Sequence, residues 1–430
     1  MPHSNIKFII NGRVIDPSQK LDEICTIRIE DGKIAEITAG SADGGLNGDY
    51  VYDAARKTVV PGLIDMHVHL REPGTEEDET IETGTKAAIH GGFTSVACCP
   101  NTVPPVDSQA TVELIQQQAA RSKNCNVFVM CCISKNREGK ELAELGQLFS
   151  AGAVACSDDG SPVEDAELMR RALEYCLMFD KPLLSHSENT SLTNGGVMNE
   201  GIVSMQLGLR GIPAAGEDVA AAQDIALAEA TGGKLHLMHV STAGAVSMVR
   251  RAKERNVKIT AEVTPHHLTL TDAQLRSFDT NFKMSPPLRS GEHVEACIAG
   301  LLDGTIDVIA SDHAPHALEK KMRELDQAPF GIVGLETSLS LIITKFVKTG
   351  IFNWSTLVEK MSVNPAKILN LNNKGSLQVG KDADITVIDP DIKWTVSKEG
   401  LYSKSKNSPY IGWELCGKAV AVFVGGERKV

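Results

Sequence analysis

The chain has 430 residues, of which 42% are hydrophobic, and carries a formal net charge of −12 at pH 7, so it can bury a large core in one large barrel or in several domains. Its acidity and the lack of any block rich in lysine and arginine exclude nucleic acid as an expected partner. The N-terminus has no apolar run behind a basic segment, and no apolar run approaches membrane-spanning length, which predicts a soluble, cytoplasmic protein without a membrane partner.

Short β-rich segments with turn signals begin and end the chain. Residues 7–60 contain FIINGRVID and CTIRIEDGKIAEIT, with Asn-Gly and Asp-Gly turns, and residues 376–430 contain SLQVGKDADITVID and AVAVFVGGERKV, which have the same pattern. Neither end has enough apolar residues to form a core alone. We therefore expect one small β-domain assembled from both termini.

Between these flanks, short apolar segments alternate with longer stretches compatible with helices, such as 79–92, 107–122 and 166–179. Such alternation implies parallel strands joined by crossover helices. The candidate strands are residues 63–69, 95–100, 126–133, 153–157, 182–186, 234–240, 258–265 and 306–312. Eight strand-helix units close naturally into a (β/α)8 barrel, which we expect over residues 59–368, flanked by residues 1–58 and 369–430.

Histidine and aspartate residues gather at the C-terminal ends of these expected strands, where barrels of this class carry their chemistry. In chain order, the polar residues at these ends are His67, His69, Asn101, Asp158, Asp159, His186, His239, His266, His267 and Asp312. The opposite strand ends carry no comparable set. Neutral imidazoles and carboxylates are ligands that a divalent transition metal such as zinc prefers, so the pattern predicts a site for one or two ions.

The two-residue period of a strand predicts which side chains point into the barrel. The side chains expected inside are His67 and His69 on the first strand and Leu235, Leu237 and His239 on the sixth. Their neighbours Val68 and His236 are expected to pack outward, against the helices.

Each of these residues also has a structural alternative. A single His-x-His motif is weak evidence for metal binding, because many histidines are simply hydrogen-bonded; the set at the other strand ends favours metal. His266 and His267 could be ligands too. The other histidines and aspartates at the strand ends already suffice for a pair of ions, which favours supporting roles for these two. Arg71 could form a structural ion pair, but its place two residues beyond His69 favours a substrate carboxylate, which matches its planar fork.

The ten cysteines are interpreted as small buried residues of a reducing compartment.

Eight motifs spread over the chain form a combination far more specific than His-x-His alone. They are PGLIDMHVHLREPG, PNT, SDDG, TPHHL, PPLR, DGTIDVIASDHAPH, APFG and SLQVGKDADITVID. Over nearly the whole length, the chain resembles the bacterial class I dihydroorotases of the amidohydrolase superfamily. The resemblance implies a (β/α)8 barrel with a small β-sandwich built from both termini. It also implies the reversible, zinc-dependent cyclisation of N-carbamoyl-L-aspartate to (S)-dihydroorotate in pyrimidine biosynthesis.

The same resemblance implies roles for individual residues. The implied metal ligands are His67 and His69 for one ion, His186 and His239 for a second, Asp159 as a bridge between the two, and Asp312, which also acts as the catalytic acid and base. The implied substrate contacts are His69, Arg71, Asn101, Ser285, His316, Phe330 and Gly331. Ser285 replaces the family's usual asparagine before PPLR and offers only one hydroxyl. Either a water restores the lost contact, or the substrate carboxylate depends more heavily on Arg71.

Two other functions remain open. One is another cyclic-amide hydrolase, such as a dihydropyrimidinase, hydantoinase or allantoinase; these typically use a modified lysine on the fourth strand, and AVACSDDG contains none. The other is a non-catalytic, dihydroorotase-like subunit of aspartate transcarbamoylase; such subunits usually lose metal ligands, whereas all six are present here. We also expect a homo-oligomer, with a dimer as one form, and leave open a complex with the transcarbamoylase. Residues 316–331 are our candidate for the loop that covers the site.

Overall fold

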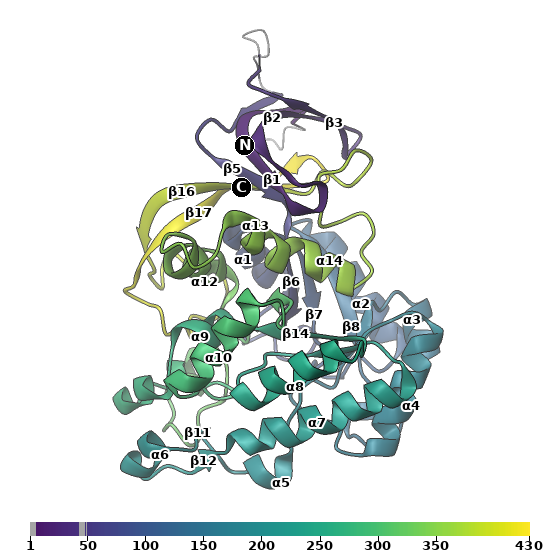
Figure 1. Cartoon of the computed structure of the whole chain (residues 1–430), viewed down its shortest axis with the longest axis vertical. Helices are drawn as coiled ribbons and strands as arrows, with labels where there is room; N and C mark the ends of the chain where they lie inside the picture. Colours follow the sequence, from purple (N-terminus) through teal and green to yellow (C-terminus); the bar gives the residue numbers. More distant parts are fainter. Residues whose placement is uncertain (1–5, 43–47, 49) are drawn as a thin grey trace.

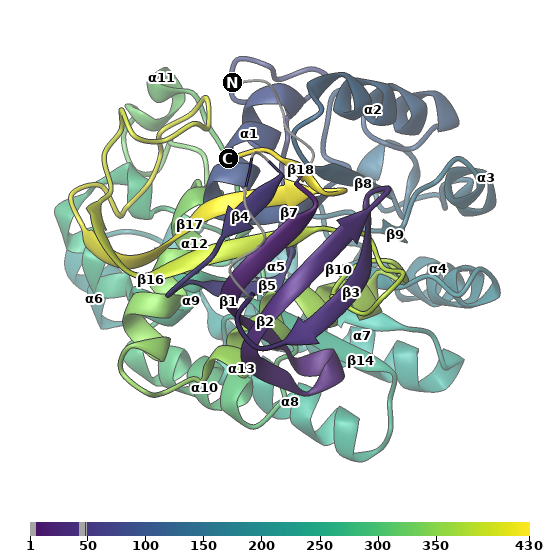
Figure 2. The same cartoon turned by 90° about the horizontal axis from the view of Figure 1, so that it is seen from above.

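The computed structural model describes residues 6–42, 48 and 50–430. A small lobe of strands from both ends of the described chain lies at one end of a helix-covered barrel (Figure 1). Figure 2, seen from above, shows the strands of the small lobe crossing over the barrel. No helix in the described ranges combines the length and the apolar character that a membrane span requires.

Eight parallel strands form the barrel, as predicted. They are β6 (Leu63–Val68), β7 (Phe93–Cys98), β8 (Asn126–Cys131), β9 (Ala155–Cys156), β10 (Leu183–Ser185), β13 (Leu235–Leu237), β14 (Ile259–Val263) and β15 (Val308–Ile309). Each strand pairs with the next in parallel. A parallel bridge between Val68 and His313 joins the two ends of the sheet, so the barrel closes. Most strands are shorter than predicted, because the chain leaves the sheet before the polar residues at the strand ends.

Helices follow the strands and cover the barrel. The longer ones are α1 (Ile81–Gly91), α2 (Gln109–Ser122), α4 (Ala166–Met178), α7 (Ala214–Thr231), α8 (Ala243–Glu254), α10 (Gly291–Leu302) and α12 (Leu335–Ile342). The shorter ones are α3 (Leu145–Ser150), α5 (Thr190–Thr193), α6 (Ile202–Leu207), α9 (Pro265–Thr269), α11 (Leu318–Lys321), α13 (Trp354–Val358) and α14 (Asn364–Ile368). Short segments of 3₁₀- or π-helix are η1 (Pro17–Gln19), η2 (Lys135–Arg137), η3 (Asp272–Ser277), η4 (Thr280–Phe282), η5 (Ile343–Val347) and η6 (Glu359–Val363). The three predicted helical stretches contain α1, α2 and α4.

The small lobe is one sheet built from both ends of the chain. Its strands are β1 (Phe8–Asp16), β2 (Leu21–Glu30), β3 (Lys33–Ala39), β4 (Val51–Asp53), β5 (Thr58–Pro61), β16 (Ile385–Thr395), β17 (Glu414–Val424) and β18 (Glu427–Arg428). β5 joins the two halves, since it pairs with β1 on one side and with β16 on the other. The turn at Gly32 contacts the turn at Gly425, so the sheet folds over its own core. The remaining pair, β11 (Met198–Asn199) and β12 (Gly211–Ile212), lies near α5 and α6 (Figure 1).

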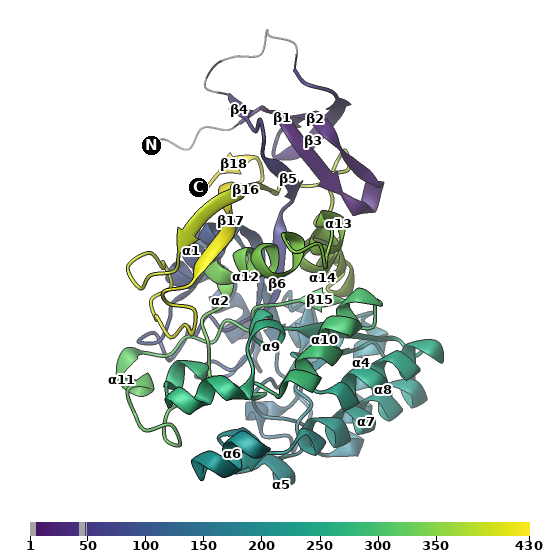
Figure 3. The ribbon, with the colours of Figure 1, turned by 60° about the vertical axis from the view of Figure 1, so that its left-hand side comes forward.

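The small lobe lies against the end of the barrel where β6 begins. The backbone N–H of Gly62 donates to the Asp384 carbonyl, 2.8 Å away, immediately before β6 begins. The long strands β16 and β17 run down beside α12 (Figure 3). The N-terminal end of β6 therefore faces the small sheet, and its C-terminal end, with His67 and His69, points away from it.

Two hydrophobic layers hold the barrel together. One layer joins outward strand residues to the helices and includes Leu63, Val96, Val129, Leu183, Leu235, Ala88, Ile115, Leu173, Ile225 and Val249. The other fills the barrel and includes Met66, Ala97, Met130, Leu184, Met238 and Val308. Because side chains fill the interior, only the mouth of the barrel has room for chemistry. The predicted (β/α)8 barrel with a small β-domain from both termini is confirmed.

The predicted orientation of side chains on β13 is wrong. Leu237 packs in the layer against the helices, whereas His236 is fully buried inside the barrel, with its Nε2 3.1 Å from Glu262 Oε2. His239 still faces the site, because its φ of +32° turns the chain after the strand has ended at Leu237. The two-residue period holds only while the backbone remains extended.

Glycine at position 91 lets α1 approach α12 closely. A Cβ there would lie 2.2 Å from the carbonyl oxygen of Leu335, a backbone atom that cannot rotate away. We expect Gly91→Ala to lower the free energy of unfolding by about 1–3 kcal/mol, because overpacking outweighs the gain in helix propensity. The measurement is the urea midpoint. Gly291→Ala, with open space around its Cβ, is the control, and equal midpoints for the two variants would contradict the expectation.

Candidate functional site

Six side chains predicted to bind metal converge at the mouth of the barrel. The set is His67, His69, Asp159, His186, His239 and Asp312. His69 Nε2 lies 3.0 Å from Asp312 Oδ1. His186 Nδ1 lies 2.8 Å from His239 Nε2. Residues as far apart in the chain as His67 and Asp312 thus meet in one cluster.

Asp159 lies between the two histidine pairs and turns one oxygen toward each. Its Oδ2 lies 3.6 Å from His67 Nε2 and 3.4 Å from His69 Nε2. Its Oδ1 lies 3.1 Å from His186 Nδ1 and 3.4 Å from His239 Nε2. This is the arrangement that a carboxylate shared by two cations requires.

Asp158, the neighbouring candidate, faces a different part of the molecule. Its carboxylate accepts hydrogen bonds from the backbone N–H groups of Ile133 and Ser134, at 2.8 and 3.1 Å, and from the Ser134 hydroxyl. Burial raises the pKa of Asp158, and these hydrogen bonds oppose that shift. The side chain therefore stabilises the turn after β8 rather than the histidine cluster.

Unusual backbone conformations aim two members of the cluster. His239 and Asp312 have φ angles of +32° and +46°, in the left-handed region that residues with a side chain rarely adopt. The buried Asp65 carboxylate accepts from the backbone N–H of Ser311, 3.1 Å away, and so ties β6 to the segment that carries Asp312. Backbone strain of this kind is common at functional sites.

Three of the four histidines are held by a hydrogen-bonding partner on the nitrogen that faces away from the centre. The pairs are His67 Nδ1 with Glu262 Oε1 (2.5 Å), His69 Nδ1 with Asn101 Oδ1 (2.9 Å) and His186 Nε2 with Glu188 Oε2 (2.9 Å). An oxygen that accepts at the outer nitrogen leaves the lone pair of the inner nitrogen free for a metal ion.

The donor set fits a divalent transition metal. His67 Nε2 is buried and has no hydrogen-bond partner among the described residues, although it lies only 3.4 Å from Asp312 Oδ1. A buried polar atom without a partner costs free energy that a bound cation recovers. Two groups of ligand atoms include His67, one with His69, Cys99 and Asp159 and one with His239 and Asp312, and within each group the atoms lie within 4.8 Å of one another.

Close contact between carboxylates and imidazoles shifts the pKa values of the cluster in opposite directions. Burial raises the pKa of Asp159, but the charge of His67 and hydrogen bonds from His186 and His239 outweigh it, so this pKa lies well below its usual value. Burial lowers the pKa of His186, but hydrogen bonds to Asp159 and Glu188 raise it to about 10. A metal ion would compete with protons for these same atoms.

A cavity of about 500 Å³ opens above the cluster. Of the residues predicted from the sequence to form the site, all except His67 and Gly331 line this cavity. His67 lies fully buried beneath it, and Gly331 lies behind Phe330 with its carbonyl bonded to the side chains of Lys321 and Asn407. The volume is typical of a pocket for a small molecule.

One wall of the cavity is basic. Arg71 Nε donates to the Pro315 carbonyl, 3.2 Å away, and Nη2 lies 3.4 Å from His316 Nε2, which donates to the Phe330 carbonyl. Burial and the charge of Arg71 lower the pKa of His316 to about 2, so this ring is neutral. No carboxylate of the described residues forms an ion pair with Arg71, which leaves its charge available to an anion. Asn407 supports this wall, because its side-chain oxygen accepts a hydrogen bond from the backbone N–H of His316.

Residues 316–331, the expected covering loop, line the cavity only through His316, Pro329 and Phe330 near its two ends. A second segment, residues 190–196 around α5, contributes five lining residues, and Ile212 on β12 adds another. The sequence contains no chemical motif in this second segment that would have revealed it.

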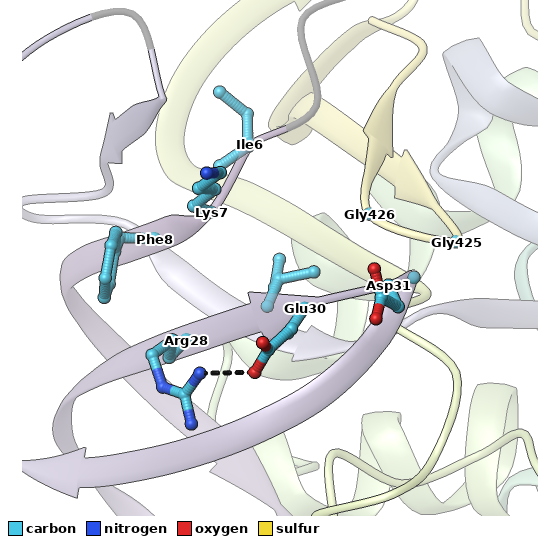
Figure 4. A pocket seen from close by; sticks show the side chains of 10 residues that line it. Ile6, Lys7, Phe8, Arg28, Glu30, Asp31, Gly425 and Gly426 are labelled. Carbon is cyan, nitrogen blue, oxygen red and sulfur yellow. Dashed lines mark hydrogen bonds and ion pairs between the residues drawn. The ribbon is translucent and has the colours of Figure 1, made fainter.

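Another cavity, of about 440 Å³, lies in the small lobe (Figure 4). Its wall is made of Ile6, Lys7, Phe8, residues 28–32, Gly425 and Gly426. Arg28 pairs with Glu30 across 2.7 Å, and the lining residues include neither histidine nor cysteine. We therefore assign the functional site to the barrel mouth.

Several site residues escaped the sequence analysis. Glu262 is the one charged residue of the buried strand ITAEV, and Glu188 is two positions after His186; both patterns were visible signals. Cys99 was interpreted as a small buried residue, but its Sγ lies within 4.8 Å of ligand atoms of His67 and His69. The pairing of β7 with β6 brings Cys99 to the floor of the site, where its backbone N–H donates to the Val68 carbonyl, 2.9 Å away.

Proteins of known family match this chain along nearly its whole length. A dihydroorotase of Pelobacter propionicus is 51% identical over 420 residues, which cover 97% of this chain and 98% of that protein. The dihydroorotase of Geobacter sp. strain M21 is 52% identical and covers 98% of each chain. The chain belongs to the dihydroorotase family. The family described as dihydro-orotase-like also matches residues 56–245, and the resemblance inferred from the motifs is confirmed.

Solved structures share the fold of this dihydroorotase family member. L-Hydantoinase from Arthrobacter aurescens has a TM-score of 0.88 at 25% identity, covering 99% of this chain and 96% of its own. D-Hydantoinase from a Thermus species has a TM-score of 0.83 at 27% identity, covering 98% and 95%. Identity to the dihydroorotases is twice as high, so the hydantoinase alternative has less support.

Proposed function

We propose that this chain is an active dihydroorotase that interconverts N-carbamoyl-L-aspartate and (S)-dihydroorotate in pyrimidine biosynthesis. The observation that carries the proposal is 51% identity to dihydroorotases over 97% of the chain. The convergence of all six predicted ligands supports catalysis over a non-catalytic subunit. The barrel domain spans residues 59–368, and the small domain combines residues 1–58 and 369–430.

The metal is zinc, as one or two ions, because imidazole and carboxylate donors suit it. His67, His69 and Asp312 hold one position, His186 and His239 hold the other, and Asp159 is shared between them. A divalent cation at these positions polarises a carbonyl group and lowers the pKa of water.

The substrate binds through its carboxylate to Arg71, whose fork matches two carboxylate oxygens. His69, Asn101, Ser285 and His316 surround the ring, and Phe330 with Gly331 closes the wall of the cavity. A carboxylate on this side turns the amide of the ring toward the histidine cluster.

Asp312 moves the proton. In hydrolysis it accepts a proton from the attacking water, the ring C–N bond breaks, and Asp312 delivers that proton to the departing nitrogen. In ring closure the same carboxylate takes a proton from the attacking nitrogen and gives it to the departing oxygen, which leaves as water with one further proton taken up from solvent. We further propose a cytoplasmic homo-oligomer, with a dimer as the simplest form; a complex with aspartate transcarbamoylase stays a prediction from the resemblance.

An assay on matched substrates tests the function. Dihydroorotate and N-carbamoyl-L-aspartate should be converted, while hydantoin and allantoin, which lack the carboxylate, should react at least about 10- to 100-fold more slowly, the value of a charged hydrogen bond. Complete chelation should abolish turnover, and added zinc should restore it. Equal rates on hydantoin would favour another cyclic-amide hydrolase. A fully metal-loaded chain without turnover on any of the four would favour the non-catalytic subunit.

A further inference from the structure

A buried carboxylate beneath the site contacts both halves of the histidine cluster. Glu262 lies on β14 inside the barrel and is fully buried. Its Oε1 lies 2.5 Å from His67 Nδ1 and 3.3 Å from the backbone nitrogen of His239. Its Oε2 lies 3.1 Å from His236 Nε2. An ionised carboxylate in an apolar barrel is costly unless it is fully paired, and these three contacts pair it.

The contact with His67 selects one form of the imidazole. A carboxylate can only accept hydrogen bonds, so Nδ1 of His67 carries the hydrogen. The other nitrogen, Nε2, then presents its lone pair to the cluster. That atom is the buried nitrogen without a partner, 3.6 Å from Asp159 Oδ2 and 3.4 Å from Asp312 Oδ1.

The contact with His239 acts through the backbone. The same oxygen, Oε1, accepts from the His239 N–H, at the residue whose φ of +32° directs its ring toward His186. A left-handed residue with a side chain persists only where surrounding contacts hold it. Glu262 supplies such a contact, so one carboxylate holds a residue from each proposed metal position.

Glu262 is itself fixed from its other side. His236 Nε2 donates to Oε2, and His236 Nδ1 lies 2.8 Å from the Thr260 hydroxyl on the same strand as Glu262. This explains why a histidine expected on the outside of the barrel lies inside: it locks the carboxylate in place.

We propose that Glu262 is a positioning residue that sets the metal affinity of both positions, by holding His67 in one tautomer and His239 in its left-handed conformation. The inference rests on the proposed metal centre. Partners of this kind typically contribute a factor of about 10 to 100 in metal affinity. The coupling of two positions through one carboxylate goes beyond the orientation of a single ligand.

The test is zinc binding by Glu262→Gln. The amide replaces one carboxylate oxygen with an NH2 group, which cannot accept a hydrogen bond. The three groups that donate to Glu262, from His67, His236 and His239, therefore lose one acceptor. We expect zinc affinity to fall about 10- to 100-fold at both positions. Affinity is measured by competition with a chromogenic chelator, and stoichiometry by metal analysis after dialysis. Excess zinc should restore occupancy. Glu336→Gln is the control, because Glu336 is a half-buried acid that accepts from the backbone of Tyr402 and Ser403, outside the cluster.

A second variant keeps the inference testable if the amide variant does not fold. Glu262→Asp retains the charge and shortens the side chain by one methylene, so it can no longer reach His67 and should lose affinity as well. Wild-type affinity in a folded Glu262 variant would overturn the inference, and so would a loss confined to one of the two ions. Absence of bound zinc in the wild-type chain would instead overturn the proposed metal centre.

Discussion

Asp312→Asn is expected to lower kcat about 10²- to 10⁴-fold, the usual contribution of a positioned acid-base group. The amide cannot accept the proton of the attacking water, while its size preserves the packing around it. The carboxylate that is lost lies 3.0 Å from His69 Nε2 and lines the substrate cavity. The measurement is steady-state turnover of dihydroorotate at saturating zinc.

Metal content must be measured on the same sample, because Asp312 also belongs to one proposed metal position. Asp158→Asn is the control: this neighbouring acid is buried but faces the turn at Ser134, so it should change stability more than kcat. Near-normal kcat in the Asp312 variant with full zinc would remove Asp312 from the proton-transfer role. A collapse of kcat in zinc-loaded Asp158→Asn would show that the two neighbouring aspartates had been assigned incorrectly.

Arg71→Lys is expected to lower kcat/KM for dihydroorotate about 10- to 100-fold, mainly through a higher KM. Lysine keeps the charge but loses the planar fork, and with it at least one charge-assisted hydrogen bond to the carboxylate. Ser285, with its single hydroxyl, offers less than the usual asparagine to compensate. The measurement is a full substrate titration for both enzymes.

A matched substrate separates carboxylate binding from general damage to the site. Dihydrouracil has the same ring without the carboxylate, so its kcat/KM should be nearly the same in Arg71→Lys and in the wild type. An equal loss on both substrates would mean that Arg71 supports the cavity wall, through Pro315 and His316, rather than binding the substrate anion.

Strand order and strand number followed from the sequence because alternation of apolar segments with helical stretches is a local property. Side-chain direction followed less well. His67 and His69 lie at the cluster as predicted, but His236 lies inside the barrel and Leu237 outside. The prediction carried the alternation through Met238 to His239, whereas β13 ends at Leu237 and the backbone at His239 is left-handed.

The amino-acid sequence by itself determined the family, the eight-unit barrel and the set of polar residues at its strand ends, because motifs, periodicity and composition are carried by neighbouring residues. Only the tertiary structure decided which Asp159 oxygen faces which histidine pair, and that Glu262, Glu188 and Cys99 lie at the site. The contact of Glu262 with His67 depends on closure of the barrel, which brings together strands far apart in the chain, whereas the place of Cys99 depends on the pairing of β7 with β6. These relations depend equally on left-handed residues at the strand ends, whose conformation is held by contacts with other strands.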